Sequence, residues 1–330
     1  MRMAILGAGH IAAKMARTLK ALSSRAEDEL PEICYAVASR DIVKAKAFAS
    51  EHGFTKAYGS YEQMLSDPAV ELVYVATPHS LHHSHVRMCL EAGKNVLCEK
   101  PFMTTAREAE DVMELAREKG LLVAEAAWPR YTPFSLQIKK MLDDGIIGKP
   151  QSMMASLGYP IKDVERIIRP ELGGGALLDM GVYGIHFAFM NFGQDISRVS
   201  SDAVMSDTGV DLQNAVTLVY NDGKMAQLHS TAMACNERRG IINGEKASMI
   251  IDNISNPLKA EVYSGRHELI AEYRAEEQIT GFEYQVLSCI RAIRQGKCEP
   301  DELPHDEILS VMRMMDSLRK QWGVRFPSDI

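Results

Sequence analysis

The sequence has no apolar run of about 18 residues, the length that a membrane-spanning helix needs. It has no excess of positive charge either, because 37 lysines and arginines stand against 44 aspartates and glutamates, for a formal net charge of -7. This balance argues against nucleic acid or an anionic membrane as the main partner. We therefore expect neither nucleic-acid binding nor membrane insertion.

Paired cysteines are also missing. The six cysteines show no C-x-x-C spacing, so we expect reduced thiols rather than a disulfide framework or a zinc site. The first strand-like run starts at Met3, too early for a signal peptide, and a cytoplasmic location is expected. The sequence contains no internal repeat and no low-complexity segment. With 330 residues it exceeds one ordinary domain, which predicts two domains.

The most informative feature that is present lies at the start of the chain. An apolar strand from Met3 runs straight into Gly7-x-Gly9-x-x-Ala12, and a helical pattern follows at residues 10–22. Gly7 permits a tight turn, Gly9 lets the backbone approach a pyrophosphate, and the small Ala12 lets the helix pack closely on the sheet. The helix amino terminus offers free N–H groups and a positive dipole end to phosphates. The predicted dinucleotide contacts here are Gly7, Gly9, His10 and Ile11.

The end of the second strand, residues 33–38, indicates which dinucleotide binds. NAD sites usually place an acidic residue there to bind the ribose 2′-hydroxyl, whereas this strand is followed by Ser39-Arg40-Asp41. Arg40 can face a 2′-phosphate with its planar guanidinium, and Ser39 leaves room for it, which predicts NADP, with NAD possible. The alternative is that Arg40 is a solvated loop charge and that Asp41 holds the ribose. A polar loop at 23–31 explains the long spacing from Gly9.

Two domains of different architecture are predicted from the pattern of strands and helices. Up to residue 127 they alternate, as in the parallel, doubly wound sheet of a Rossmann α/β domain. Beyond residue 133, longer alternating or β-branched runs predict an α+β domain with a large, mostly antiparallel sheet. Helical periodicity returns at 281–322. We expect an NADP-binding domain at 1–127 and a substrate-binding and dimerisation domain at 128–330.

The expected elements follow from the same periodicities. In the first domain the predicted helices are 10–22, 44–52, 62–65, 83–92 and 105–119, and the strands after the first are 33–38, 71–76, 95–98 and 121–127. In the second, a helix at 134–143 precedes strands at 151–157, 199–205, 214–220, 224–231, 247–252 and 260–264.

One candidate catalytic segment ends the strand at 95–98, where Glu99-Lys100-Pro101 follow. A lysine at a strand end can hydrogen-bond a substrate hydroxyl and lower the pKa of a nearby acid. The alternative is an ordinary surface pair of Glu99 and Lys100. We expect the chemistry in the crevice at the carboxyl ends of the strands, where the first domain meets the second.

The other candidate segment opens with glycines at 173–175 and continues into a helix. Asp179, Tyr183 and His186 recur on it four and three residues apart, and so share one face. A carboxylate, a phenol and an imidazole suit proton transfer, provided that a cation such as Lys100 lowers the Tyr183 pKa from about 10. The alternative is that Tyr183 and His186 are buried and only satisfy backbone groups.

Several stretches match the pattern of one known family. They are GAGHIA at the start, TPHSLHHSHVRMCLEAGKNVLCEKP at 77–101 and GGGALLDMGVYGIHF at 173–187. Together they resemble the Gfo/Idh/MocA family of oxidoreductases, for which EKP in this setting is highly specific. EAAWPRYTPF, ASRD and the closing GVRFP are similar to a branch that holds dimeric dihydrodiol dehydrogenases and NADP-dependent D-xylose dehydrogenases. The resemblance covers essentially the whole chain.

The resemblance implies roles for individual residues. In the family the lysine of EKP contacts the substrate, and in this branch the tyrosine of the glycine-rich helix is the acid/base, which implies these roles for Lys100 and Tyr183. Asp179 would orient the substrate or tune the pair. His186, one turn beyond the tyrosine, is held in reserve as a proton carrier. The implied substrate contacts are Trp128, Arg130 and His186.

The segment after the third predicted strand departs from the family pattern. Thr77-Pro78-His79 stands where many relatives have Thr-Pro-Asn, and His82 fits the family's helix-opening histidine. The remaining predicted cofactor contacts are Thr77, Pro78, His79, His82, Glu99 and Lys100. No cysteine or carboxylate joins the histidines of this segment at a ligand spacing, so no metal is predicted.

These observations predict an NAD(P)-dependent dehydrogenase. It would transfer a hydride between the nicotinamide and a carbinol carbon of a sugar, polyol or trans-dihydrodiol, with Tyr183 as acid/base assisted by Lys100. The alternative is a non-catalytic NADP-binding sensor or regulatory protein, against which the intact Lys100, Asp179 and Tyr183 argue. A homodimer is expected through an apolar sheet face of the second domain, with strands 214–220 and 224–231 as candidates.

Overall fold

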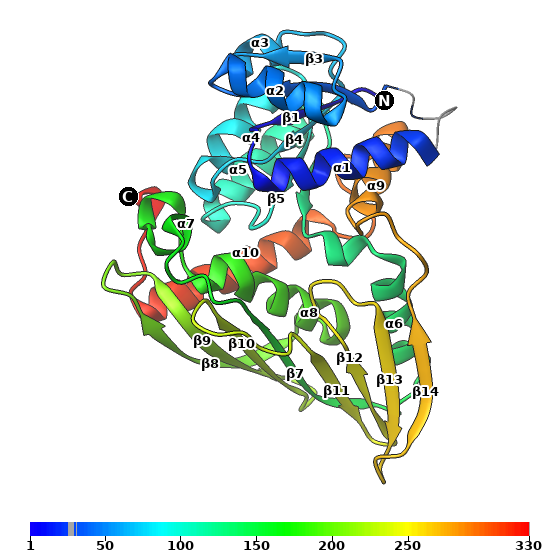
Figure 1. Cartoon of the computed structure of the whole chain (residues 1–330). Coiled ribbons are helices and arrows are strands. Elements are labelled where there is room, and N and C mark those ends of the chain that lie inside the picture. Colours follow the sequence, from blue (N-terminus) through cyan, green and yellow to red (C-terminus); the bar gives the residue numbers. More distant parts are fainter. Residues whose placement is uncertain (26–29, 31, 330) are drawn as a thin grey trace. The chain divides into compact units, whose positions relative to one another are not determined.

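The computed structural model describes residues 1–25, 30 and 32–329. The chain forms two compact units (Figure 1). The first unit comprises Met1–Trp128 and Gln278–Ile308, and the second comprises Pro129–Glu277 and Leu309–Ile330. In the described part of the chain, no helix is long and apolar enough to cross a membrane.

A parallel sheet of six strands forms the centre of the first unit, in the order β3-β2-β1-β4-β5-β6 (Figure 1). This order reverses direction between β1 and β4 and is that of a doubly wound Rossmann sheet, which confirms the predicted fold of the amino-terminal part. Both central strands are fully buried, as parallel strands covered by helices on both faces must be. The strands are β1 (Met3–Leu6), β2 (Cys34–Ala38), β3 (Lys56–Tyr58), β4 (Leu72–Val75), β5 (Asn95–Glu99) and β6 (Val123–Ala126).

Helices with well-defined ends connect these strands. In α5, the Thr105 hydroxyl accepts a hydrogen bond from Glu108 N at 3.2 Å and the Glu108 carboxylate accepts one from Thr105 N at 3.3 Å, a capping box. Gly120 ends this helix with φ 63°. The helices are α1 (His10–Arg25), α2 (Ile42–His52), α3 (Tyr61–Leu65), α4 (His82–Glu91) and α5 (Ala106–Lys119). Three residues of the predicted loop at 23–31 are helical in α1, and 26–29 and 31 lie outside the described residues.

The segment Gln278–Ile308 packs with the first unit, whereas the sequence interpretation assigned all of 128–330 to the second domain. It carries α9 (Glu283–Arg294), whose apolar side is buried. The hydroxyls of Thr280 and Thr18 hydrogen-bond at 2.6 Å, which ties this segment to α1. Helical periodicity predicts a buried face but does not specify which sheet that face covers. The sequence therefore did not show that this segment packs with the first unit.

An eight-stranded sheet forms the second unit, in the order β14-β13-β12-β11-β7-β10-β9-β8. Every neighbouring pair is antiparallel except β7 and β10, which are parallel, and this confirms the predicted large, mostly antiparallel sheet. The strands are β7 (Pro150–Gly158), β8 (Ile196–Met205), β9 (Asp211–Tyr220), β10 (Met225–Thr231), β11 (Gly240–Gly244), β12 (Ala247–Ile251), β13 (Lys259–Ser264) and β14 (Leu269–Arg274).

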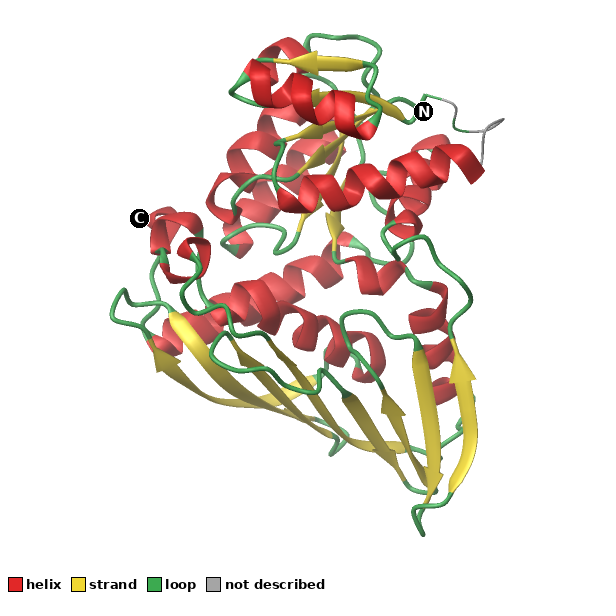
Figure 2. Cartoon of the chain, viewed as in Figure 1, coloured by secondary structure: helices red, strands yellow, loops and turns green. Residues whose placement is uncertain are grey.

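The two faces of this sheet differ. Figure 2 shows the helices of the second unit on one face only. Burial alternates accordingly along β10, where Ala226 and Leu228 are buried and Met225 and Gln227 are exposed. The helices of this unit are α6 (Pro133–Asp143), α7 (Glu165–Ile168), the π-helix η4 (Leu177–Gly181), α8 (Val182–Phe192) and the part of α10 (His305–Trp322) that follows Ile308.

Candidate functional site

The turn between β1 and α1 has the geometry of a phosphate-binding loop. Gly7 has φ 104°, and a Cβ there would lie 2.8 Å from the carbonyl oxygen of Ala76, so only glycine fits. A Cβ at Gly9 would meet nothing within 4 Å, so the backbone at the start of α1 is open. His10 is exposed and Ile11 half-buried beside it. These residues therefore fit the pyrophosphate of a dinucleotide, which the N–H groups of the first turn of α1 would hold.

The two charged residues that follow β2, Arg40 and Asp41, differ in their contacts within the described part of the chain. Asp41 Oδ1 accepts hydrogen bonds from Val43 N at 2.8 Å and Lys44 N at 3.3 Å, so Asp41 is the N-cap of α2. Arg40 is exposed and makes no salt bridge with another residue in the described ranges. Ser39 is buried, and its hydroxyl accepts a hydrogen bond from Asp41 N at 3.3 Å. This arrangement favours Arg40 as the group that meets the 2′ substituent.

His82 holds together the loops that follow β4 and β5. The ring is fully buried, with Nε2 3.0 Å from the Thr77 carbonyl oxygen and Nδ1 2.9 Å from that of Pro101. Burial lowers the pKa of His82, although both carbonyl contacts oppose this shift. Thr77 Oγ1 also lies 3.0 Å from His85 Nδ1. His82, predicted as a cofactor contact, thus lies inside the protein, between the segments that carry Thr77 and Lys100.

Glu99 is the buried member of the EKP motif. Its carboxylate accepts hydrogen bonds from the Tyr74 hydroxyl and, at 3.2 Å, from Lys100 N. Burial raises the pKa of Glu99, while the Tyr74 hydrogen bond and the charge of Lys100 oppose the rise. Glu99 and Lys100 are therefore not an ordinary surface pair, because the carboxylate is buried at the end of β5 and fixes the backbone from which the Lys100 side chain projects.

Lys14 is a neighbour of this group that sequence reasoning missed. Its ammonium lies 4.0 Å from the ring centre of Phe282 and 4.7 Å from that of Trp128. Burial lowers the Lys14 pKa, and the charge of Glu99 opposes the shift. The available signal was helical spacing, since Lys14 follows His10 by four residues on α1. Trp128, a predicted substrate contact, is itself buried against Phe282 in the first unit.

The remaining histidines of the His-rich segment have separate partners. His83 Nε2 lies 2.7 Å from Asp111 Oδ2, and burial lowers the pKa of His85 to about 4. His79 lies on a short 3-10 helix, with its ring 5.7 Å from that of His82. Among the described residues, no three His, Cys, Asp or Glu side chains are grouped as metal ligands.

The glycine-rich segment of the second unit places Asp179, Tyr183 and His186 on one continuous helix that begins as a π-helix. Asp179 lies in η4 and is nearly buried, with Oδ1 2.8 Å from an Arg166 guanidinium nitrogen. Tyr183 is half-buried, whereas His186 is only 4% exposed. The wider η4 turn differs from the expected α-helix, and such turns recur at functional sites. No motif in the sequence pointed to Arg166. Its relevance comes from its ion pair with Asp179, which lies in a separate segment.

The predicted site residues are divided between the units. The dinucleotide contacts, Lys100 and Trp128 belong to the first unit. Asp179, Tyr183, His186 and the buried Arg130 belong to the second. Each unit thus carries one part of the predicted constellation.

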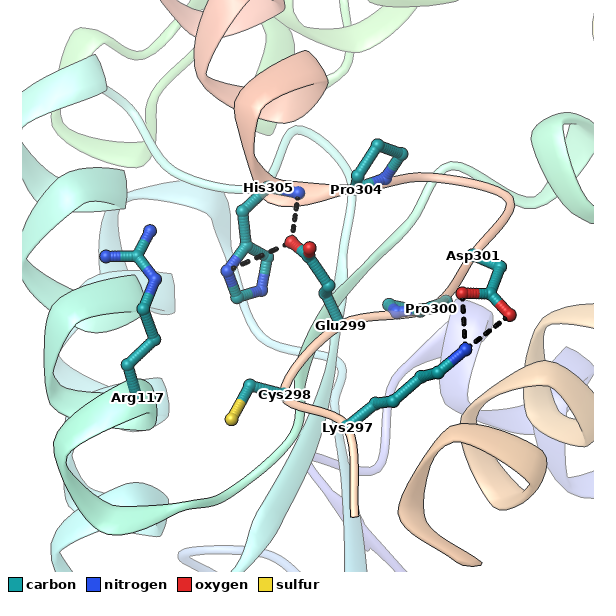
Figure 3. A pocket seen from close by; sticks show the side chains of 8 residues that line it. All are labelled: Arg117, Lys297, Cys298, Glu299, Pro300, Asp301, Pro304 and His305. Atoms are coloured by element: carbon teal, nitrogen blue, oxygen red, sulfur yellow. Dashed lines mark hydrogen bonds and ion pairs between the residues drawn. The ribbon is translucent and has the colours of Figure 1, made fainter. Parts of the chain in front are cut away.

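A separate pocket of about 410 Å³ lies in the first unit (Figure 3). Its charged side chains largely satisfy one another: Lys297 Nζ pairs with Asp301 at 2.7 Å, and Glu299 accepts a hydrogen bond from His305 N at 2.6 Å. None of the predicted site residues lines it. The lining residues are Arg117, Lys297, Cys298, Glu299, Pro300, Asp301, Pro304 and His305.

A Rossmann unit with an open glycine turn, followed by a unit that presents a tyrosine and a carboxylate on one helix, defines a class of dinucleotide-dependent oxidoreductases. Residues 1–126 match the family model described as an oxidoreductase family with an NAD-binding Rossmann fold, and residues 135–250 match the Gfo/Idh/MocA C-terminal domain. The chain belongs to the Gfo/Idh/MocA family, which confirms the resemblance, the predicted enzyme class and a nicotinamide dinucleotide as the cofactor.

Curated relatives include trans-1,2-dihydrobenzene-1,2-diol dehydrogenases. The protein of Xenopus laevis is 33% identical over 298 residues, covering 88% of this chain and 90% of the relative. The human protein is 31% identical over 335 residues, covering 100% and 99%. Among solved structures, a 3-ketoreductase from Actinomadura kijaniata in complex with NADP and TDP-benzene is 27% identical, with a TM-score of 0.84 and 97% of both chains covered.

Proposed function

We propose that this protein is an NADP-dependent dehydrogenase acting on a carbinol carbon of a sugar, a polyol or a trans-dihydrodiol. The observation that carries the proposal is the position of Tyr183 on α8. Tyr183 and His186 are the two predicted proton carriers. Tyr183 is half-buried and keeps access to solvent, whereas His186 is almost completely buried. Tyr183 is therefore assigned as the acid/base, and His186 as a residue that packs behind it.

The preference for NADP rests on the two charges after β2. The Asp41 carboxylate accepts hydrogen bonds at the start of α2, so it is occupied where an NAD site would use it for the ribose. Arg40 is exposed and has the planar donor group that binds a 2′-phosphate. The related 3-ketoreductase, which was crystallised with NADP, supports the same choice.

When bound, the nicotinamide accepts or supplies the hydride. In the direction of oxidation, the Tyr183 hydroxyl takes the proton from the substrate hydroxyl, and the positive charge of Lys100 stabilises the developing alkoxide. Asp179, fixed by Arg166, accepts a hydrogen bond from a second substrate hydroxyl.

Buried groups in the first unit hold Lys100 in place. Glu99 accepts a hydrogen bond from its backbone N–H, and His82 bridges the neighbouring loops. We assign His82 to positioning of these loops rather than to direct contact with the dinucleotide. Solved structures of the related 3-ketoreductase include one lysine-to-alanine and one tyrosine-to-phenylalanine mutant, the residue types to which this mechanism gives the main roles.

We also propose a homodimer formed through the helix-free face of the second unit's sheet. Met154 and Met225 are 51% and 41% exposed there, on β7 and β10. Half-buried Ile241 and Ile250, paired across β11 and β12, add two more apolar side chains to these positions. The predicted cytoplasmic location stays a prediction.

The test measures nicotinamide absorbance with NADP+ or NAD+ and a panel of aldoses, polyols and cyclic trans-diols. Turnover with NADP+ and one substrate class is expected. Tyr183→Phe should lower kcat at least about 100-fold while NADP still binds, because the acid/base is removed and the dinucleotide turn is intact. Tyr159→Phe, a change of the same kind at a partly exposed tyrosine, is the matched control.

Two results would count against the proposal. A Tyr183→Phe protein that turns over as fast as the wild type would remove the assignment of the acid/base. NADP binding without turnover across the whole panel would favour the sensor alternative.

A further inference from the structure

A buried carboxylate that the mechanism does not use lies beside the start of the glycine-rich helix. Asp211 begins β9 and is 1% exposed. Its Oδ2 accepts hydrogen bonds from Leu177 N at 2.8 Å and from Asn214 Nδ2 at 2.7 Å. Ser230 Oγ, on β10, donates to Asn214 Oδ1 at 2.9 Å. We call Asp211, Asn214 and Ser230 the Asp211 chain; it links the first N–H of η4 to two strands of the sheet.

The glycines of this segment show how closely the helix approaches the Asp211 chain. Gly175 has φ 111°, and a Cβ there would run into Asp211 Oδ1. A Cβ at Gly181 would lie 3.2 Å from Ser230 Oγ. Gly175, two residues before η4, and Gly181, the last residue of η4, thus both lie against the Asp211 chain. Since α8 follows η4 directly, these contacts fix where α8 begins.

Asp211 supplies a helix cap from a distant strand. The residue before η4, Ala176, makes no side-chain capping hydrogen bond, and the Leu177 N–H donates to Asp211 instead. An ionised carboxylate also interacts favourably with the positive end of a helix. Tyr183 lies less than two turns further along, so a shift of η4 would displace both Asp179 and Tyr183.

Asp211 carries a carboxyl group at a buried position whose hydrogen-bond partners are neutral. Burial raises the pKa of Asp211 to about 6, whereas Asn214, the Leu177 N–H and the charge of Arg319 on α10 oppose the rise. The partners from β9 and β10 are neutral, and η4 itself carries the carboxylate of Asp179. A neutral isostere would avoid the desolvation of a charge, so the carboxylate serves the geometry of the helix start.

We propose that Asp211 is a positioning residue for the reaction: it fixes η4 and so holds Asp179 and Tyr183 at the geometry that proton transfer needs. This inference rests on the proposed function, because it assigns Asp211 a role through Tyr183. Asp211 is buried, and the proposal assigns it no contact with substrate or cofactor.

The test compares Asp211→Asn with Asp202→Asn, a change of the same kind at an exposed position on β8. For Asp211→Asn, kcat should fall about 10- to 100-fold with an unchanged Kd for NADP, since small displacements of a catalytic group have effects of this size. Wild-type kcat should decline below pH about 6 as Asp211 takes up a proton, and Asp211→Asn should lack this limb. A purely structural role would not remove a titration from the pH profile.

Hydrogen exchange provides a readout that needs no turnover. The Leu177 amide should exchange faster in Asp211→Asn than in Asp202→Asn, with exchange in β1 and α1 unchanged. Ser230→Ala, which removes only the outer hydrogen bond of the Asp211 chain, should lower kcat by about 2- to 5-fold and covers the case in which Asp211→Asn does not fold.

The possible outcomes separate this inference from the proposed function. Absence of wild-type turnover counts against the proposed function, and exchange at Leu177 still tests the anchor. Normal kcat and an unchanged acid limb in folded Asp211→Asn, or normal kcat in Ser230→Ala where Asp211→Asn does not fold, would overturn the positioning role.

Discussion

Two glycine turns in this protein resemble each other locally and are used in opposite ways. Gly7 and Gly175 have φ of 104° and 111°, and a Cβ at either position would collide with a neighbour. At Gly7 that neighbour is a backbone carbonyl, and the helix start beyond it is open at Gly9. At Gly175 it is the Asp211 carboxylate, which also accepts the first N–H of η4. One turn leaves the start of its helix open, and at the other the first N–H of the helix is bound by a buried carboxylate of the protein.

The largest expected effect comes from adding a methyl group to the open turn. Gly7→Ala should abolish measurable dinucleotide binding and lower the free energy of unfolding by about 1–3 kcal/mol, because it forces a positive φ and a backbone clash on alanine. Gly9→Ala should weaken binding at least about 10-fold with stability nearly unchanged, since its Cβ enters open space. Dinucleotide titration and denaturant unfolding measure the two quantities. Equal losses of stability in both variants would contradict the open geometry at Gly9.

Arg40 tests the predicted preference for NADP over NAD. Arg40→Ala should weaken NADP binding about 10- to 100-fold and leave NAD binding within about twofold, because only the 2′-phosphate loses a charge-assisted partner. Lys46→Ala, an exposed cation on α2, is the control for a general loss of positive charge. Parallel titrations with both dinucleotides give the ratio. Equal weakening for NAD and NADP would show that Arg40 does not read the 2′ substituent.

Asp211, the carboxylate beside the Gly175 turn, should make the stability of the protein depend on pH. Burial raises the pKa of Asp211 to about 6, so the folded state binds the proton more tightly than the unfolded chain. Its contribution is therefore favourable below pH about 4 and is lost as the pH rises through about 6, a change of at most about 3 kcal/mol. Unfolding of the wild type and Asp211→Asn at pH 4 to 7 checks this. An identical pH slope in the two proteins would contradict it.

Asp67, a carboxylate in the first unit, should change stability with pH in the opposite direction to Asp211. This is the smallest of the expected effects. Hydrogen bonds from Lys56 and Tyr58 hold the pKa of Asp67 well below its usual value. Its stabilisation is present above the unfolded pKa near 4 and is lost as the pH falls through the folded value. Lys56 is largely exposed, so Asp67→Asn should reduce stability at pH 7 by only about 1 kcal/mol. Unfolding of both proteins between pH 2 and pH 7 measures this. The assignment would be contradicted if the wild type gained stability from pH 4 to pH 2 and Asp67→Asn did not.

Most of the fold was predictable where burial and periodicity agree. The alternating elements up to residue 127 correspond closely to the observed ones, because buried parallel strands are continuous apolar runs. β3 was missed because it is a three-residue edge strand, and β14 because its exposed and half-buried positions give no alternation of apolar residues. β11 starts and ends with glycine and becomes a strand because β7 and β12 pair with it on either side.

The candidate site was predictable only in part. Glycine positions, the EKP lysine and the spacing of Asp179, Tyr183 and His186 can be read along the chain. Arg166, Lys14 and Asp211 carry no motif, since their importance arises from contacts with other segments.

By itself the sequence determined the open turn, because its requirements are local: a glycine that can adopt a positive φ, a second without a side chain, and a helix start next to them. Only the tertiary structure decided the fate of the second glycine turn. Asp211 lies 34 residues from Leu177 in the chain, and the sheet brings the carboxylate to that N–H. A local pattern specifies backbone conformation, but whether a polar group meets a ligand or a buried side chain depends on what folding places beside it.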